Sequence, residues 1–560
     1  MRLLQNFRKT AALAALAALV LAAALAPAGA QPPKQPPVPH QTFMVPMRDG
    51  KRLATDVYLP PGAGPWPVIL LRTPYNKSGL AGVGADGMRR NYVIVGQDTR
   101  GRFRSEGENQ PFVGEGWAKH SDGYDTLEWI AKQPWCNGKI GTNGGSALGI
   151  SQLFDEGSGT TRIDAQEIVV GAPCMYQYMA FPGGVFKKSM VMDWTTACKF
   201  EPEGLQQWLR HPDYDGYWRE RDLTRRWNKV NAPAVHVGGW FDIFTQGTID
   251  SFVGYQEHGG PRARGHQKLL VGPWTHGVLM DKAGDLSFRN GSRPPGNLAD
   301  SWMWFDAELK HASNGIESAP AVTYYVMGDA FDPAAPGNVW RTAHRWPPVP
   351  TQPTPYYLRP DHGLSPERPA SGAPLAYAYD PAHPCPTCGG PQLTIPAGPR
   401  DQKNVESRQD VLLFTSEPLA SPLEVTGRVH VRLSASSDAP DTDFTAKLCD
   451  VYPDGRSFNV CEGILRARFR NGLDREVLMK PGHIYSFDID MASTSIVFNK
   501  GHRLRVQITS SSDPGFDPNP NTGAPFRANS ETRVAHNTVY LSGSHASCII
   551  LPIPSGAPGE

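Results

Sequence analysis

The sequence predicts an α/β domain that carries a helical insertion, followed by a separate all-β domain. The chain has 560 residues, and a single hydrophobic core rarely extends beyond about 250–300 residues, so at least two cores are expected. Short apolar runs alternate with helical patterns as far as about residue 345. After the proline-rich linker 346–353, apolar residues recur with a period of two, which is typical of a β-sandwich.

The first thirty residues have the pattern of a secretory signal. Residues 1–9 are basic, residues 10–25 form an apolar run, and Ala28-Gly29-Ala30 is a small-residue cleavage site. The apolar run is shorter than the roughly 20 residues that span a bilayer. We therefore expect cleavage after Ala30 and a periplasmic or secreted protein, in which residues 31–39 form a proline-rich lead-in.

Residues 40–163 are expected to form the first part of the α/β core. Asp49-Gly50 indicates a hairpin turn, and short apolar runs between turn residues are typical of buried parallel strands. Pro134 ends a helix whose first turn contains Asp125. The expected strands are Thr42–Met47, Arg52–Leu59, Val68–Leu71, Tyr92–Val95 and Lys139–Thr142, and another helix begins at Ala147.

The character of the sequence changes at about residue 164. Residues 164–231 are rich in Met, Trp, Tyr and Arg and lack strand alternation, so we expect a helical cap there. The α/β core resumes over residues 232–345, and residues 354–560 are expected to form a jelly-roll domain. The expected strands are Ala234–Val237, Lys268–Val271 and Val322–Met327 in the core, then Val425–Leu433, Asp443–Val451, Arg503–Thr509 and Thr538–Ser542 in the jelly roll.

Charge narrows the range of partners. The formal net charge is +1, and residues 1–30 hold three basic and no acidic residues, which leaves −2 for the remainder. No basic stripe is present, which argues against nucleic acid or an anionic membrane surface as a partner. We expect a small-molecule or short peptide substrate and no cofactor or metal, and the sequence leaves homo-oligomer formation open.

The chain contains eight cysteines, and export would permit disulfides. Cys385 and Cys388 form a Cys-x-x-Cys motif without a second pair at zinc spacing, which favours a small disulfide over a zinc half-site or a redox motif. Cys449 and Cys461 flank a Pro-Asp-Gly turn, so a cross-strand bridge is the expectation there. The full connectivity stays open.

Three residues have the order of a serine-hydrolase triad. Ser146 lies in Gly144-Gly-Ser-Ala-Leu-Gly149, where glycines suit a sharp turn from strand to helix. Asp242 and His276 each follow a predicted core strand. The order Ser, Asp, His is that of α/β-hydrolases and differs from other serine-hydrolase folds. A serine hydroxyl needs a histidine to take its proton, and the histidine needs an orienting acid.

Other residues are candidates for the remainder of the site. The backbone N–H of Ala147 and the phenol of Tyr75, which follows an early strand, are candidate oxyanion donors. For Tyr75, ordinary packing is the equal alternative on position alone. Trp240, Phe241 and Trp274 flank the triad residues, and we expect them either to line the substrate pocket or to pack in the core.

The chain resembles the cocaine esterase / X-Pro dipeptidyl-peptidase family of serine hydrolases (CocE/NonD, peptidase S15). The resemblance implies an α/β-hydrolase core, a helical cap and a C-terminal jelly roll. It also implies Ser146 as nucleophile, Asp242 and His276 as its partners, and Tyr75 with the Ala147 N–H as the oxyanion hole. The motifs that carry it are Arg72-Thr-Pro-Tyr-Asn-Lys77, Gln97-Asp-Thr-Arg-Gly101, Ser105-Glu-Gly107, Trp135-Cys-Asn-Gly138, Gly144–Gly149, Gly239-Trp-Phe-Asp242, Gly272-Pro-Trp-Thr-His276, Ser437–Phe444 and Asp450–Gly455.

Two departures from the family pattern bear on the substrate. The family usually has a tyrosine directly after the nucleophile, and Ala147 here predicts a wider acyl pocket. Related α-amino-acid ester hydrolases carry carboxylates just after the triad aspartate, whereas residues 243–245 are Ile-Phe-Thr. An ammonium there would lack a partner, which argues against that substrate type. Asp213 and Asp215 in the cap are candidates for holding a free N-terminus, although acids in a polar segment are usually solvated.

Two further sets of charged residues are interpreted as structural and not as catalytic or metal-binding. Asp98, Arg100 and Arg102 suit an ion pair or loop clamp behind the site, since no step of acyl transfer needs them. Asp438, Asp441 and Asp443 lack the later glutamate of an EF-hand, so a turn is favoured over calcium binding.

The sequence therefore predicts an exported serine hydrolase that cleaves an ester or amide through an acyl-enzyme. The alternatives are an X-Pro dipeptidyl-peptidase with the same triad and a catalytically silent protein whose jelly roll binds a glycan or another partner.

Overall fold

The computed structural model describes residues 38–555, so the expected signal segment lies outside the described residues. The first half of the chain forms a ten-stranded sheet in the order β1-β2-β4-β3-β5-β6-β7-β8-β11-β12. The strands from β4 to β11 in this order are parallel, and antiparallel strands complete both edges. The bounds are β1 Gln41–Pro46, β2 Arg52–Tyr58, β3 Trp66–Thr73, β4 Val93–Asp98, β5 Cys136–Gly145, β6 Ala165–Val169, β7 Ala234–Gly239, β8 Lys268–Gly272, β11 Val322–Val326 and β12 Val339–Ala343.

Helices cover both faces of this sheet, as continuous apolar strands require. In β3, alternate side chains enter two different cores: Ile69 packs with α2 and α9, and Leu70 packs with α3. Helices α4 and α8 lie against β5 and β7, on strands that end at the site described below. The helix bounds are α2 Ala81–Arg89, α3 Asp122–Ala131, α4 Ala147–Gly157, α8 Thr245–His258 and α9 Ser301–Lys310. This is the expected α/β-hydrolase arrangement.

A helical segment separates β6 from β7. The expectation that the cap begins at residue 164 is wrong, because residues 165–169 pair with β5 and β7 as a strand of the core sheet. The helical segment contains α5 Lys188–Ala197, α6 Pro202–Leu209 and α7 Gly216–Arg219, and Pro202 occupies the first turn of α6, where a missing N–H costs nothing. Its aromatic side chains form one buried cluster with the first turns of α4. The abundance of Trp, Tyr and Met in this segment therefore reflects a hydrophobic core that belongs to the cap. This core packs on the first turns of α4, directly after the end of β5.

The second half is a β-sandwich of two sheets. One sheet has the order β14-β13-β23-β17-β22-β15 with β20 paired to β17, and the other has the order β16-β21-β18-β19. Their facing side chains form one large apolar cluster that also reaches β11. The bounds are β13 Thr351–Leu358, β14 Leu364–Ser365, β15 Leu375–Tyr379, α10 Lys403–Glu406, β16 Leu412–Thr415, β17 Leu423–Ser437, β18 Asp443–Val451, β19 Ser457–Arg466, β20 Tyr485–Phe498, β21 Arg503–Thr509, β22 Ala535–Tyr540 and β23 Cys548–Pro554; a short hairpin, β9 Lys282–Ala283 and β10 Leu286–Ser287, precedes α9.

All eight cysteines are free, so both expected bridges are wrong. Cys461 lies opposite Leu448, and both enter the sandwich core. A register shift follows Leu448, and Cys449 lies on the other face, where its Sγ accepts a hydrogen bond from Gln507. Two thiols on opposite faces of a sheet cannot bond. The thiols of the Cys-x-x-Cys motif donate to separate backbone carbonyls.

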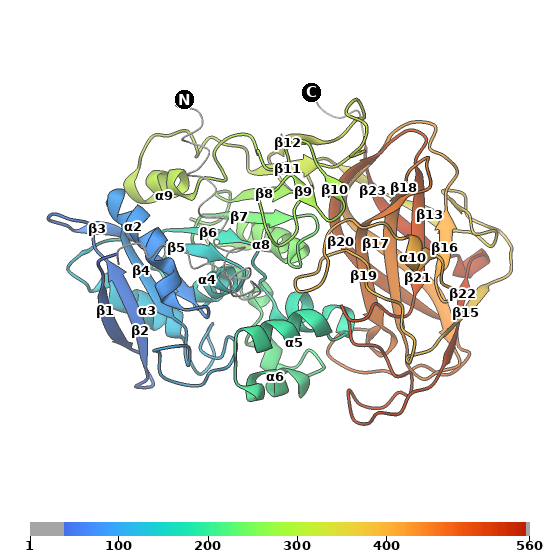
Figure 1. Cartoon of the computed structure of the whole chain (residues 1–560), viewed down its shortest axis with the longest axis horizontal. Helices are drawn as coiled ribbons and strands as arrows, with labels where there is room; N and C mark the ends of the chain where they lie inside the picture. The colour runs from blue at the N-terminus through green and yellow to red at the C-terminus, as the bar shows by residue number, and fades with distance from the viewer. Residues whose placement is uncertain (1–37, 556–560) are drawn as a thin grey trace, which may run out of the picture.

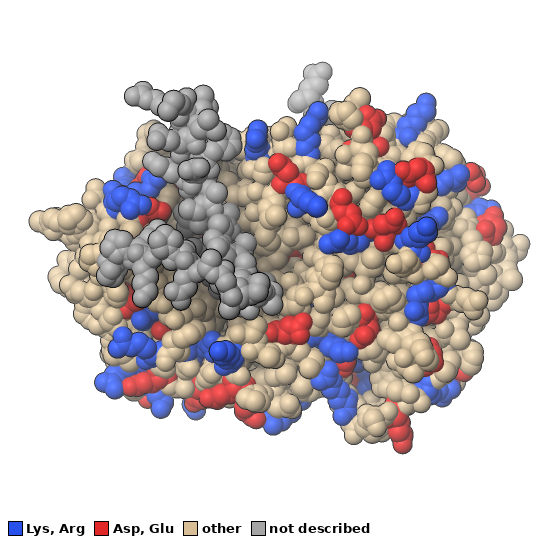
Figure 2. Space-filling view, in the orientation of Figure 1, with Lys and Arg blue, Asp and Glu red and all other residues tan. Residues whose placement is uncertain are grey.

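The α/β half and the sandwich lie side by side, and α5 and α6 lie near the junction between them (Figure 1). On the face shown in Figure 2, Lys and Arg are interspersed with Asp and Glu. Within residues 38–555, no helix is long and apolar enough to cross a membrane.

Candidate active site

Ser146 occupies a strained turn between β5 and α4. Its backbone has φ 59° and ψ −122°, a conformation that costs a non-glycine residue free energy and recurs at functional sites. Two of the flanking glycines are required sterically: a Cβ on Gly144 would lie 2.5 Å from Leu148, and one on Gly149 would lie 3.0 Å from a backbone oxygen of β6. The turn therefore presents the serine hydroxyl at the carboxyl edge of the sheet.

Asp242 and His276 meet Ser146 at this edge because they follow the neighbouring parallel strands β7 and β8. His276 Nε2 lies 2.8 Å from Ser146 Oγ, and His276 Nδ1 lies 2.6 Å from Asp242 Oδ1. The second carboxylate oxygen of Asp242 accepts the backbone N–H of Phe244 at 3.0 Å. Asp242 is 1% exposed, so its carboxylate is held on both sides and directed at the imidazole.

The two expected oxyanion donors also lie at the serine. The hydroxyl of Tyr75 hydrogen-bonds Ser146 and accepts the indole N–H of Trp194 at 3.0 Å. Burial raises the pKa of Tyr75 well above its ordinary value, which keeps the phenol protonated and able to donate. The N–H of Ala147 belongs to the first turn of α4, where backbone N–H groups have no partner within the helix.

The space beside Ser146 is unequal on its two sides. A cavity of about 110 Å³ extends from Ser146 past Tyr75 and His276 along the carboxyl ends of the strands. On the side of Ala147 the cavity is only about 10 Å³, because Trp194, Phe244 and Leu393 close around it. The wider pocket expected from Ala147 is therefore absent, since a leucine from the sandwich domain occupies the region.

The three aromatic residues expected in the substrate pocket lie elsewhere. Trp274 is fully buried and donates its indole N–H to the carbonyl of Gly291. Trp240 donates to the carbonyl of Tyr325, and with Phe241 it faces a separate cavity of about 340 Å³ between the two domains. None of the three lines a cavity that reaches Ser146. They pack in the core, the alternative that the sequence left open.

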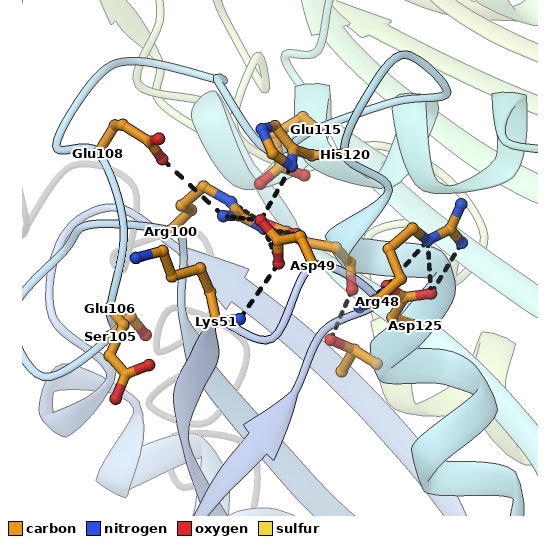
Figure 3. A network of polar contacts seen from close by, with 12 residues as sticks. Arg48, Asp49, Lys51, Arg100, Ser105, Glu106, Glu108, Glu115, His120 and Asp125 are labelled. Carbon is orange, nitrogen blue, oxygen red and sulfur yellow. Dashed lines mark hydrogen bonds and ion pairs between the residues drawn. The ribbon is translucent and has the colours of Figure 1, made fainter.

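A buried ion network supports the loops behind the site. Arg100 lies at its centre and binds Asp49 (Figure 3). It also donates to the carboxylate of Asp122. Arg102 donates to the carbonyl of Pro74, directly before Tyr75, and Asp98 accepts the backbone N–H of Lys77, just after it. These contacts agree with a structural role as a loop clamp.

Arg72 connects the oxyanion loop to the nucleophile. It leaves the end of β3 and forms an ion pair with Asp155 of α4 at 3.0 Å, and it also pairs with Glu115. All three side chains are buried. Burial raises the pKa of Asp155, while the guanidinium opposes that rise. The ion pair fixes the helix that follows Ser146 relative to the strand that precedes Tyr75.

The remaining acidic candidates do not reach the site. Asp215 caps α7 and contacts His211, and neither it nor Asp213 lines the cavities at Ser146. In the sandwich, Asp441 and Asp443 form ion pairs with Arg468 and Arg466. Asp438 accepts from His536. Among residues 38–555, no group of three or more His, Cys, Asp or Glu could hold a metal ion.

Sequence reasoning missed two residues that contact this site. Trp194 of the cap, which holds the Tyr75 hydroxyl, has no pattern that separates it from the other cap aromatics. Glu167 lies on β6 and lines the cavity at Ser146. Two adjacent polar residues, Gln166 and Glu167, interrupt the apolar pattern of β6, so the sequence did not mark these residues as a core strand or Glu167 as a site residue.

Comparison with known proteins places this geometry in a family. Residues 49–204 and 190–278 match the model of the X-Pro dipeptidyl-peptidase (S15 family), and residues 314–550 match the X-Pro dipeptidyl-peptidase C-terminal non-catalytic domain. The cocaine esterase of Rhodococcus sp. (strain MB1 Bresler) is 34% identical over 91% of this chain and 97% of its own. The chain belongs to the S15 family of serine hydrolases.

Other proteins are similar to this chain over nearly its full length. A putative serine esterase of Mycobacterium bovis is 28% identical over 92% of this chain and 95% of its own. The solved structure of an α-amino acid ester hydrolase, at 25% identity, superposes with a TM-score of 0.77 over 94% of this chain and 100% of its own. An aminopeptidase from a Thaumarchaeota archaeon, at 25% identity, gives 0.76 over 94% and 99%. The protein is thus an S15-family hydrolase of the CocE/NonD type.

Proposed function

We propose that this protein cleaves a carboxylic ester through an acyl-enzyme on Ser146. The observation that carries the proposal is the pair of short contacts that join Ser146 Oγ, His276 and Asp242, at 2.8 Å and 2.6 Å. Nδ1–H of His276 donates to the carboxylate, which leaves Nε2 to accept the serine proton. The preference for an ester over an amide is supported by the 34% identity to a cocaine esterase.

The chemistry follows from this geometry. Ser146 Oγ attacks the acyl carbon while His276 takes its proton, and the imidazolium then gives that proton to the leaving alcohol. Negative charge develops on the acyl oxygen, which the Tyr75 hydroxyl and the Ala147 N–H are placed to stabilise. Water, activated by the same histidine, attacks the acyl-enzyme and releases the acid and free Ser146.

Two other functions remain as alternatives. An X-Pro dipeptidyl-peptidase would need an acid that reaches the N-terminus of a dipeptide acyl group. Asp213 and Asp215 do not line the cavities at Ser146, and the cavity that contains Glu167, at about 110 Å³, is too small for an Xaa-Pro unit. A silent binding protein would have no reason to keep three catalytic groups in hydrogen-bond contact. The ester reaction therefore accounts for more of the observed geometry.

The decisive experiment is covalent labelling. Treatment with a fluorophosphonate is expected to add one adduct to the intact protein, detected by mass spectrometry, and none to the Ser146→Ala variant. Hydrolysis of p-nitrophenyl esters should disappear in the same variant. A folded wild-type protein that takes up no adduct would contradict the proposal and favour the binding-protein alternative.

We also propose that the protein is exported, because residues 1–30 combine a basic start, an apolar run and a small-residue cleavage site. These residues lie outside the part of the chain that the structure describes. Edman sequencing of protein recovered from the periplasm or medium should begin at Gln31. Recovery of the uncleaved chain from the cytoplasm would contradict export.

A further inference from the structure

A carboxyl group shares the cavity of the nucleophile. Glu167 lies on β6 beside Asn143 of β5, and Asn143 precedes Ser146 by three residues. Its side chain is 7% exposed and lines the same cavity of about 110 Å³ as Ser146 and His276. The acyl-transfer steps described above do not use this group.

The surroundings of Glu167 leave its charge without a counterion. The Asn143 amide donates to one carboxylate oxygen, and the hydroxyl of Ser301 also hydrogen-bonds the group. Neither neighbour is charged, and Asp300 adds a second negative charge nearby. Among the described residues that line the cavity, none is Lys or Arg. Burial raises the pKa of Glu167 to about 8, as expected for a carboxylate without a cation.

Most of the remaining cavity wall is apolar, with Thr73, Asn76 and Ser301 as further polar side chains, and the cavity is small. The apolar part is formed by Leu71, Leu80, Leu148, Val169 and Val237. Its volume is a few times the roughly 30 Å³ share of one liquid water molecule, so it accepts a short chain of a few heavy atoms. The other side of Ser146 offers only about 10 Å³. One arm of the substrate must therefore enter the cavity that contains Glu167.

We propose that Glu167 is a specificity-determining residue that selects substrates whose arm in this cavity ends in a small protonated amine. Given the hydrolysis proposed above, the amine displaces the proton of Glu167 and forms a charge-assisted hydrogen bond with the carboxylate. The apolar walls contact the methylene groups between the amine and the ester. An arm that ends in a carboxylate is excluded by Glu167 and Asp300. The absence of carboxylates just after Asp242 argues against an ammonium site at that position. The site proposed here is a different one, because Glu167 lies on β6.

The test compares esters that differ only in a cationic group. For the acyl arm, the pair is the p-nitrophenyl esters of β-alanine and butyric acid, in which NH₃⁺ replaces CH₃. For the alcohol arm, the pair is 2-(dimethylamino)ethyl acetate and 3-methylbutyl acetate. In one of the two pairs, the wild-type protein should show a kcat/KM ratio of about tenfold or more in favour of the cation.

Two variants show whether Glu167 is responsible. Glu167→Gln should reduce that ratio by about tenfold, because the amide keeps the shape and removes the charge. Glu156→Gln is the matched control: Glu156 is another fully buried glutamate with a raised pKa, but it accepts backbone N–H groups of residues 231 and 232 away from the cavity. Its ratio should equal that of the wild type. A wild-type preference for the neutral ester in both pairs, or an unchanged ratio in Glu167→Gln, would overturn the proposal.

A measurement without variants covers the case in which Glu167→Gln fails to fold. The wild-type ratio should rise between about pH 6 and pH 8 as Glu167 loses its proton in the free enzyme. His276 lines the same cavity. Attack on either ester requires His276 as a neutral base, so this requirement is common to both esters and cancels in the ratio. A ratio that is flat or falls over this range would contradict the proposal.

A binding experiment separates this inference from the hydrolytic function. Propylammonium chloride is titrated calorimetrically into Ser146→Ala protein, which lacks the nucleophile. Binding that is lost in the Ser146→Ala, Glu167→Gln double variant would support the amine site even if no ester were hydrolysed. Absence of binding to Ser146→Ala, with hydrolysis of neutral esters intact in the wild type, would overturn the amine site alone.

Discussion

At the scale of single residues, the site depends on where each side chain points, and sequence order predicts only part of that. Ser146, Asp242 and His276 could be placed because each follows a core strand, and parallel strands end at one edge. Trp240 and Trp274 also lie beside triad residues in the chain, yet both turn into the core. A position just after a core strand therefore predicts at which edge of the sheet a residue lies, but not whether its side chain points into the site or into the core.

Tyr75 is expected to stabilise the transition state rather than to bind the substrate. Tyr75→Phe removes a donor to the developing oxyanion, so kcat should fall by about 10²–10³-fold with little change in KM. Steady-state kinetics on a p-nitrophenyl ester would measure this. Trp194→Phe removes only the indole N–H that orients the phenol, so it should reduce kcat by less than Tyr75→Phe does. Equal kcat values for Tyr75→Phe and wild type would exclude Tyr75 from the oxyanion hole.

Glu156 is expected to make the folded protein more sensitive to rising pH. Burial raises its pKa from 4.5 to about 7, so between these values the folded state retains a proton that the unfolded state has released. Stability contributed by this group is present below the lower value and is lost as pH rises, by up to about 1.4 kcal/mol per pH unit. Melting temperatures from pH 4.5 to 7 should therefore fall less steeply in Glu156→Gln, and an unchanged slope would contradict the shift.

At the scale of elements, most core strands and the helical cap could be predicted because their patterns are local. Strand β6 could not, since Gln166 and Glu167 interrupt the apolar run expected of a buried strand. Continuous apolar runs gave buried parallel strands, and period-two alternation gave the sandwich. The register of β18 with β19 could not be predicted, because a bulge moves Cys449 to the face opposite Cys461 without any marker in the sequence. Leu393 could not be placed beside Ser146 either, since the contact depends on how two domains pack.

The ion pairs of Arg72, which join β3 to α4, are expected to contribute strongly to the free energy of unfolding. Arg72→Met leaves the carboxylates of Glu115 and Asp155 buried without a cation, which should destabilise the protein by about 3–5 kcal/mol near neutral pH. The loss should shrink in acid, where Asp155, whose pKa burial already raises, becomes neutral. Urea unfolding at two pH values measures both effects.

A surface pair provides the control for that experiment. Arg48 binds Asp125 at 2.7 Å but is half-exposed, so Arg48→Met should cost at most about 1 kcal/mol. If the two variants were equally stable, the buried network would not be what holds α4 against β3.

At the scale of the whole molecule, the site is built by all three parts of the chain. The α/β core supplies the triad, the cap supplies Trp194, and the sandwich supplies Leu393. The 340 Å³ cavity between the domains lies behind Asp242, so the sandwich also borders the triad from the rear. The similarity to the family likewise covers both halves of the chain.

Leu393→Ala is expected to open the closed side of the site. Removal of the side chain enlarges a cavity of only about 10 Å³ beside Ala147. The kcat/KM for esters with a longer arm on that side should therefore increase. Methyl hexanoate and hexyl acetate, each compared with methyl acetate, test the acyl and alcohol arms in turn. In the variant, the kcat/KM of the long ester relative to methyl acetate should rise several-fold for one of the two arms. Unchanged kcat/KM ratios for both arms would show that Leu393 does not restrict the length of the substrate.

The position of Leu393 has a consequence for how such an enzyme diversifies. It lies in a connecting segment between β15 and α10, far along the chain from the strands that hold the triad. Connecting segments tolerate substitution and insertion better than core strands do. Substrate range on this side can therefore drift through changes in the second domain while the catalytic geometry is conserved. A laboratory library at Leu393 and its neighbours, with Gly389, Gly390 and Gly398 kept, would sample new substrates without changing a strand of the catalytic sheet.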